Sequence, residues 1–218
     1  MGGRIINIPL PMSASMRPLI RTLIASAFIP ALNAHAHLGD DATQVITPAH
    51  PVWLLEQPYA DAPMLTARTF GASAYDGYSV KANLAISCHP QNPSAGIELE
   101  ISPQSLGFDV APFEGKGAAK DGPLRITTGT RASVDHSING VWTHGGVFQV
   151  STIFVLRGSV PRDELAYWAS DASRGQSLTL SLAPAQEGGK PLTATFVLPA
   201  NNTGLKKVIQ PCLGTATP

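Results

Sequence analysis

Apolar and polar residues alternate along several short segments of the chain, which is the pattern of β-strands with one buried face. In Leu192–Leu198 (LTATFVL) every second residue from Leu192 on is apolar, and in Ser177–Leu182 (SLTLSL) the three leucines share one face. Turn-forming Gly and Pro separate these segments and together make up 39 of the 218 residues. The predicted strands are Tyr78–Cys88, Gly96–Ile101, Leu124–Thr128, Thr130–Val134, Val147–Val155, Ser177–Leu182 and Leu192–Leu198.

The segments between the strands predict turns and two short helices. The paired glycines of Ala183–Pro191 favour a hairpin between the last two strands. Pro161–Ala169 has acidic residues near its start, and Thr203–Gln210 is followed by Pro211, which we expect to end the helix. Ala111–Gly122 is typical of a loop.

These elements predict a mostly β fold, an antiparallel β-sandwich or partly open barrel with one or two short helices. We expect the β-sandwich domain to span residues 77–213, after an extended lead-in over 37–76 that lies on the domain surface.

The first 36 residues have the pattern of a secretory signal peptide. Arg17 and Arg21 precede an acid-free apolar run over Thr22–Leu32, and Ala34-His35-Ala36 supplies the small-x-small cleavage pattern. Met16 offers a second start, which would make residues 1–15 an upstream over-call. The run is shorter than the roughly 20 apolar residues that cross a bilayer, so we expect a periplasmic or secreted protein with no membrane insertion after cleavage at Ala34 or Ala36.

The charge balance argues against nucleic-acid binding, and the two cysteines indicate a disulfide. The full chain has 15 basic and 15 acidic side chains, and three of the basic ones lie in the predicted signal, so no basic stripe for nucleic acid is present. The two cysteines, Cys88 and Cys212, are predicted to form a disulfide because exported proteins rarely keep free thiols. The alternative is two separate thiols.

No motif in the chain indicates an active site, so we expect a protein that is not an enzyme. A Gly-x-Ser-x-Gly nucleophile elbow is absent, as are the phosphate-binding and dinucleotide-binding glycine loops. Asp135-His136 and His144-Gly145-Gly146 are interpreted as solvated turns rather than catalytic groups. Glu98 and Glu100, two apart on one strand, are expected on its outer face.

A metal hypothesis rests on the histidines at the predicted cleavage site. Cleavage after Ala34 or Ala36 would expose His35 or His37 at the new N-terminus, where the amine and the imidazole together can chelate Cu(II). The chain would then be a copper-binding protein; otherwise we expect no cofactor.

The second half of the chain also carries a family resemblance. A strand ending in Cys88, the segment LAYWAS at 165–170, Thr195–Leu198, Gly204-Leu205 and Cys212 follow one another over Ser79–Cys212. This order resembles exported bacterial proteins of the type VI secretion-associated VasI/TagO type and, more loosely, of the invasion-associated locus B type. The resemblance implies a non-catalytic envelope domain with Cys88 and Cys212 at the paired-cysteine positions.

Two further hypotheses concern the partner, which we expect to be an envelope protein. The first is an accessory domain that binds a protein of a secretion system. The alternative is a periplasmic immunity protein or enzyme inhibitor. The predicted contact residues are aromatic: Tyr75, Tyr78, Phe113, Trp142 and Trp168.

Overall fold

The computed structural model describes residues 50–57, 59, 62–89, 94–115, 124–146, 148–149, 151–184 and 188–214. All of them lie within one compact unit, Thr43–Pro218. Its strands are β1 (Leu54–Glu56), β2 (Leu65–Tyr75), β3 (Tyr78–Cys88), β4 (Ala95–Ile101), β5 (Leu124–Thr128), β6 (Val134–His136), β7 (Ile138–His144), β8 (Thr152–Val160), β9 (Ser177–Leu182) and β10 (Leu192–Val197). Its helices are α1 (Pro103–Leu106), α3 (Arg162–Trp168) and α4 (Thr203–Leu213), with 3-10 turns η1 (Ala111–Phe113) and η2 (Asp171–Ser173).

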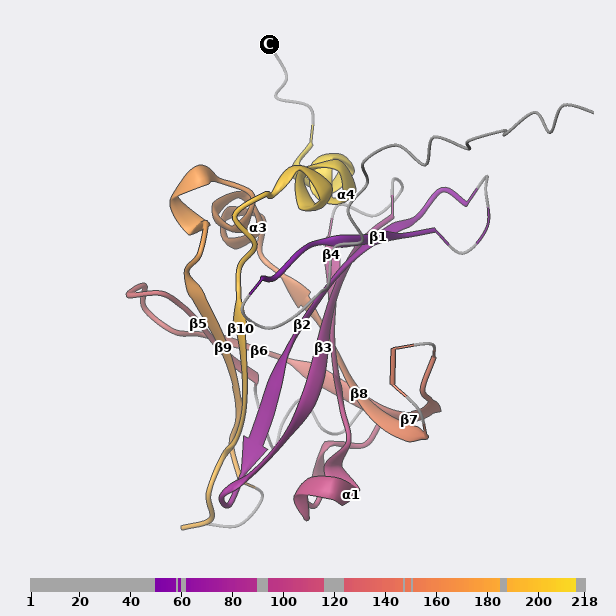
Figure 1. The fold of residues 1–218 in the computed structure, drawn as a ribbon, viewed down its shortest axis with the longest axis vertical. Coiled ribbons are helices and arrows are strands. Elements are labelled where there is room, and N and C mark those ends of the chain that lie inside the picture. The colour runs from indigo at the N-terminus through magenta and orange to yellow at the C-terminus, as the bar shows by residue number, and fades with distance from the viewer. Residues whose placement is uncertain are drawn as a thin grey trace, which may run out of the picture. The chain divides into compact units, whose positions relative to one another are not determined.

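The strands form one antiparallel sheet that curls into a nearly closed barrel (Figure 1). Their order is β6-β5-β9-β10-β2-β3-β4-β8-β7, and β1 pairs with the first half of β2. The two ends of this order are joined by the chain itself, because Ser137 is the only residue between β6 and β7. β6 pairs with β5 whereas β7 pairs with β8, so the segment changes partner at Ser137 and brings the two ends of the sheet together.

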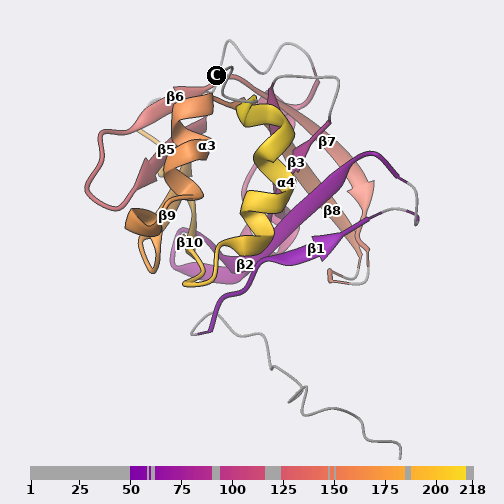
Figure 2. The same cartoon turned by 90° about the horizontal axis from the view of Figure 1, so that it is seen from above.

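The hydrophobic core fills the interior of the barrel. Alternate residues of the strands are buried there, most regularly in β4, where Ile97, Leu99 and Ile101 are almost fully buried. Figure 1 places α3 and α4 at one end of the barrel and α1, with the β2–β3 turn, at the other. Figure 2, seen from above, shows α3 and α4 side by side over their end of the barrel.

The predicted disulfide is confirmed. Cys88, at the end of β3, is bonded to Cys212 in α4, and their Cα atoms are 5.9 Å apart. Both cysteines are buried in the hydrophobic core. The bond therefore holds the C-terminal helix against the barrel across 124 residues of sequence.

The mostly β fold predicted from the sequence is confirmed, and three strands, β3, β5 and β9, have the predicted bounds. The lead-in predicted for residues 37–76 is wrong in its described second half, because Leu65–Tyr75 is β2, which pairs with β3 along its whole length. Between Leu65 and Tyr75 at its ends, the inward-facing residues of β2 are small or polar, namely Ala67, Thr69, Gly71 and Ser73, so the middle of the strand has no alternating large apolar residues.

A close contact explains the small residues of β2. A Cβ atom on Gly71 would overlap the Thr195 carbonyl oxygen and the Phe196 ring, both on β10. The apolar volume at this level of the barrel is supplied by Phe196, which is almost fully buried. Small residues on β2 are therefore required by the neighbouring strand.

Other predicted bounds also differ, and the strand predicted over Thr130–Val134 is wrong, because only Val134 belongs to a strand, β6. The segment around Asp135-His136, interpreted as a turn, is β6 and is followed by β7, while the strand predicted over Val147–Val155 is β8 at Thr152–Val160. The helix predicted to stop before Pro211 continues to Leu213. Pro211 has no backbone N–H to donate, and Cys212, the next residue, is held by the disulfide. None of the helices in the described residues is long and apolar enough to span a bilayer.

Candidate functional site

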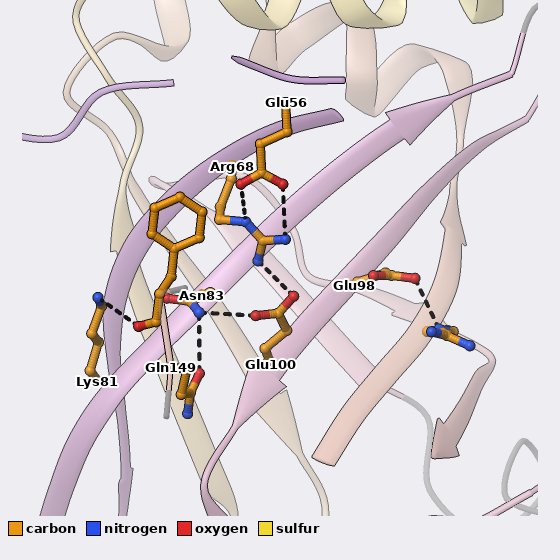
Figure 3. Close-up of polar contacts among 9 residues, drawn as sticks. Glu56, Arg68, Lys81, Asn83, Glu98, Glu100 and Gln149 are labelled. Carbon is orange, nitrogen blue, oxygen red and sulfur yellow. Dashed lines mark hydrogen bonds and ion pairs between the residues drawn. The ribbon is translucent and has the colours of Figure 1, made fainter. Parts of the chain in front are cut away.

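The densest polar cluster lies on the outer face of the sheet, and we call it the outer-face ion network (Figure 3). Its centre is Arg68 on β2, which donates from Nε to Glu56 Oε1 at 2.7 Å and from Nη1 to Glu100 Oε1 at 2.6 Å. Asn83 Nδ2 on β3 donates to Glu100 at 2.9 Å and to Gln149 Oε1 at 3.1 Å. The network therefore joins β1, β2, β3, β4 and the β7–β8 connection.

The centre of the network is largely buried. The Arg68 and Glu100 side chains are only 12% and 13% exposed. Burial alone would lower the pKa of Arg68, but hydrogen bonds and charge attraction from Glu56 and Glu100 outweigh it and raise the pKa. Because the guanidinium is forked, it holds both carboxylates at once, so the network fixes β1 to the sheet.

An aromatic pair lies beside the network: Phe148 comes from the β7–β8 connection and Phe70 from β2, and the Arg68 guanidinium lies 5.6 Å from the Phe148 ring centroid. The Phe148 and Phe70 rings meet edge to face with centroids 5.4 Å apart. Lys81 Nζ lies 4.4 Å from the Phe70 centroid and donates to the Phe148 carbonyl oxygen at 3.1 Å. These contacts hold residues 148–149 against the sheet. We therefore interpret the outer-face ion network as structural: it joins neighbouring strands and the β7–β8 connection.

Glu98 and Glu100 of β4 were predicted to lie on the outer face of their strand. Both point outward, as expected, but only Glu98 is substantially exposed, in an ion pair with Arg157 at 2.9 Å. Glu100 is mostly buried because Arg68 and Asn83 lie over it. In the described ranges, no three histidine, cysteine, aspartate or glutamate side chains are arranged to hold a metal ion.

A second cluster lies at the end of the barrel that holds α1, and four of the five predicted contact residues lie there. We define the aromatic end as Tyr75, Tyr78, Phe108, Phe113 and Trp142. Tyr75 and Tyr78 are cross-strand neighbours at the β2–β3 turn. The Tyr75 ring meets Phe108 edge to face at 4.9 Å, and Phe108 is stacked on Phe113 at 5.8 Å.

The aromatic end combines a buried base with an accessible rim. Phe113 is fully buried, whereas Tyr75 and Trp142 are half-buried and Tyr78 is 65% exposed. Phe108 and Trp142 line one groove of about 240 Å³, together with residues of α1 and η1. Trp142 is held in place by Phe154, whose ring centroid is 5.1 Å away. Rigid, partly exposed aromatic side chains around a groove are typical anchors for a protein partner.

Two of the five predicted contact residues are wrong. Phe113 is the buried base of the aromatic end and has no accessible surface. Trp168 is 1% exposed and belongs to α3 at the opposite end of the barrel. Its Nε1 donates to Thr128 Oγ1 at 2.9 Å, so its polar atom is satisfied inside the core.

The interpretation of Asp135-His136 as a solvated turn is wrong for His136. Asp135 is exposed and pairs with Arg125, but His136 is 5% exposed and lies 3.3 Å from the Glu164 carboxylate of α3. The sequence signal was a period-two alternation through residues 134–140, in which the histidine occupies an inward position. His35 and His37 lie outside the described residues, so copper binding stays a prediction.

The chain matches no family model, no curated protein and no solved structure in the comparisons made. The site must therefore be interpreted from its own geometry. The residues that sequence reasoning missed are Arg68, Asn83, Phe108, Gln149 and Glu164. They are single polar or aromatic residues outside any motif, and their partners are distant in sequence.

Proposed function

We propose that this protein is a non-enzymatic accessory domain of the cell envelope, which binds a protein partner through the aromatic end. The observation that carries the proposal is that Trp142 and Phe108 line a groove at the end of the barrel where Tyr75 contacts Phe108 and the exposed Tyr78 pairs with Tyr75. Large aromatic side chains that are already fixed lose little conformational entropy on binding, which is why they dominate many interfaces.

Two other features support this proposal. A buried disulfide fits a protein that matures in an oxidising compartment such as the periplasm. The resemblance of Ser79–Cys212 to VasI/TagO-type proteins favours a partner within a secretion system. If the partner is instead a toxin or a lytic enzyme, the same surface would serve an immunity or inhibitor role.

The proposal is tested by site-specific photo-crosslinking of the full chain in envelope preparations. A photoreactive side chain at Tyr78 reports on the aromatic end. The same group at Tyr59, in the β1–β2 connection, is a matched control, because both tyrosines are 65% exposed. We expect a discrete crosslinked protein from position 78 and none from position 59. Equal crosslinking from both positions, or none from position 78, would refute the proposal.

The captured protein then serves a quantitative test. Tyr78→Ser should weaken its binding at least about tenfold, as expected for the loss of more than about 1.4 kcal/mol at an aromatic anchor, whereas Tyr59→Ser should leave the affinity unchanged. The identity of the partner separates the two roles: a component of a secretion machine supports the accessory role, and a toxin or lytic enzyme supports inhibition.

A further inference from the structure

The point where the chain changes from β6 to β7 contains an unusual hydrogen bond. The ladder between β7 and β8 ends at the pair Ile138–Gly158, so the next β8 carbonyl group, that of Ser159, has no strand partner there. The imidazole of His136, the last residue of β6, takes this place, with Nδ1 3.1 Å from the Ser159 oxygen. A side chain thus completes the barrel where the backbone ladder stops.

This contact determines the protonation of His136. A carbonyl oxygen can only accept, so Nδ1 must carry the hydrogen. A neutral imidazole has one N–H group, which would leave a lone pair on Nε2. Nε2, however, lies 3.3 Å from Oε2 of Glu164, and an ionised carboxylate also only accepts.

The arrangement is therefore matched to one additional proton. The two side chains are only 4% and 7% exposed, so water cannot separate two facing lone pairs at low cost. Nε2 and Oε2 are close enough for an ion pair, although they are not aligned as a hydrogen bond. With a proton on Nε2, the contact between His136 and Glu164 becomes an attraction of opposite charges.

Other charges around His136 leave this conclusion unchanged. Asp135, its neighbour on β6, is exposed and is paired with Arg125 of β5 at 2.9 Å. Arg162, at the start of α3, lines a cleft of about 400 Å³ beside His136 together with Asp135. The contact with Glu164 raises the pKa of His136; burial opposes this effect, and Ser159 and Asp135 add to it.

We propose that His136 and Glu164 form a proton-dependent clamp, which joins the β6–β7 corner of the barrel to α3 and releases the helix when the proton is lost. The pKa of His136 in the folded protein lies above its ordinary value of 6.5. The contribution of the His136–Glu164 contact to folding stability is therefore fully present below about pH 6.5. It is lost as the pH rises through the pKa of His136 in the folded protein. This inference does not depend on the binding role of the aromatic end.

The experiment uses the whole protein and two variants. Amide hydrogen exchange of α3 and urea unfolding are measured from pH 5.5 to 8.5, and the His136 imidazole is titrated by NMR. In the wild type, the opening constant of α3, corrected for intrinsic exchange, should increase with pH. The increase should reach about tenfold for each unit by which the folded pKa of His136 exceeds the unfolded one.

Glu164→Gln is the informative variant, because its amide N–H can donate to the lone pair of a neutral His136. The clamp would then hold at high pH, and the pH dependence of α3 opening should largely disappear. Glu98→Gln, which alters the exposed pair with Arg157 on the outer face, is the matched control and should keep the wild-type dependence.

Two results would overturn the proposal. One is a His136 titration at or below pH 6.5 in the wild type, which requires no variant and so decides the matter even if Glu164→Gln fails to fold. The other is the same pH dependence of α3 opening in the wild type and in Glu164→Gln.

Discussion

Replacing both cysteines by alanine should remove a large share of the stability of the fold. Cys88 and Cys212 are 124 residues apart, so the disulfide closes most of the described chain into one loop. On the chain-entropy model, a crosslink of this span lowers the entropy of the unfolded chain enough to contribute about 5 kcal/mol to the free energy of unfolding. A domain of this size typically has a total of about 5–15 kcal/mol.

The double variant Cys88→Ala/Cys212→Ala should consequently unfold with a midpoint lower by roughly 10–20 °C. Urea unfolding followed by circular dichroism measures the loss of free energy. In the double variant, the free energy of unfolding should fall more steeply with urea concentration, because the unfolded chain without the crosslink exposes more surface. Wild-type protein in reductant is the control that carries no substitution.

The reasoning would be refuted by a double variant that is within about 1 kcal/mol of the wild type and has an unchanged denaturant dependence. That result would mean that the unfolded chain is already compact, so the crosslink removes little entropy from it. Two titratable thiols in the native oxidised protein would contradict the disulfide itself.

Three further substitutions test the packing, each by urea unfolding. Arg68→Ala leaves two largely buried carboxylates without their cation and should cost about 3 kcal/mol, whereas Arg157→Ala, at an exposed pair, should cost less than about 1 kcal/mol; equal costs would contradict the structural role of the network. Trp168→Phe should cost about 1–3 kcal/mol, and adding Thr128→Val should cost little more if the two share a buried hydrogen bond. Gly71→Ala should prevent normal folding because the added methyl group overlaps β10; near-wild-type stability would contradict the packing there.

Strands β3, β4 and β9 were predictable because their own residues carry the signal. In β3, β4 and β9 large apolar side chains alternate with polar ones, so the local sequence indicates both the strand and its buried face. β2 was missed because the middle of its buried face is small: Gly71 leaves room for the backbone and the Phe196 side chain of β10. No window of sequence around β2 contains Phe196, which supplies the missing volume.

In the candidate sites, too, the sequence identified residue types, while the tertiary structure determined which residues are accessible and which lie together. Tyr75, Tyr78 and Trp142 were selected as aromatic residues, but their meeting at one end depends on the pairing of β2 with β3 and on the position of Phe108. Trp168 and Phe113 were selected on the same basis and are buried. Residue type alone does not distinguish an anchor from a core residue.

The sequence by itself determined the β class, the faces of the strongly alternating strands and, with only two cysteines present, which residues could form the disulfide. These properties follow from periodicity and composition, which are local or countable. The tertiary structure decided the place of β2 in the sheet, the corner at Ser137, the outer-face ion network and the surroundings of His136. Each of these depends on side chains brought together from distant parts of the chain. Only when the strands pair is it decided which residue neutralises a buried charge and which large side chain packs against a strand of small residues.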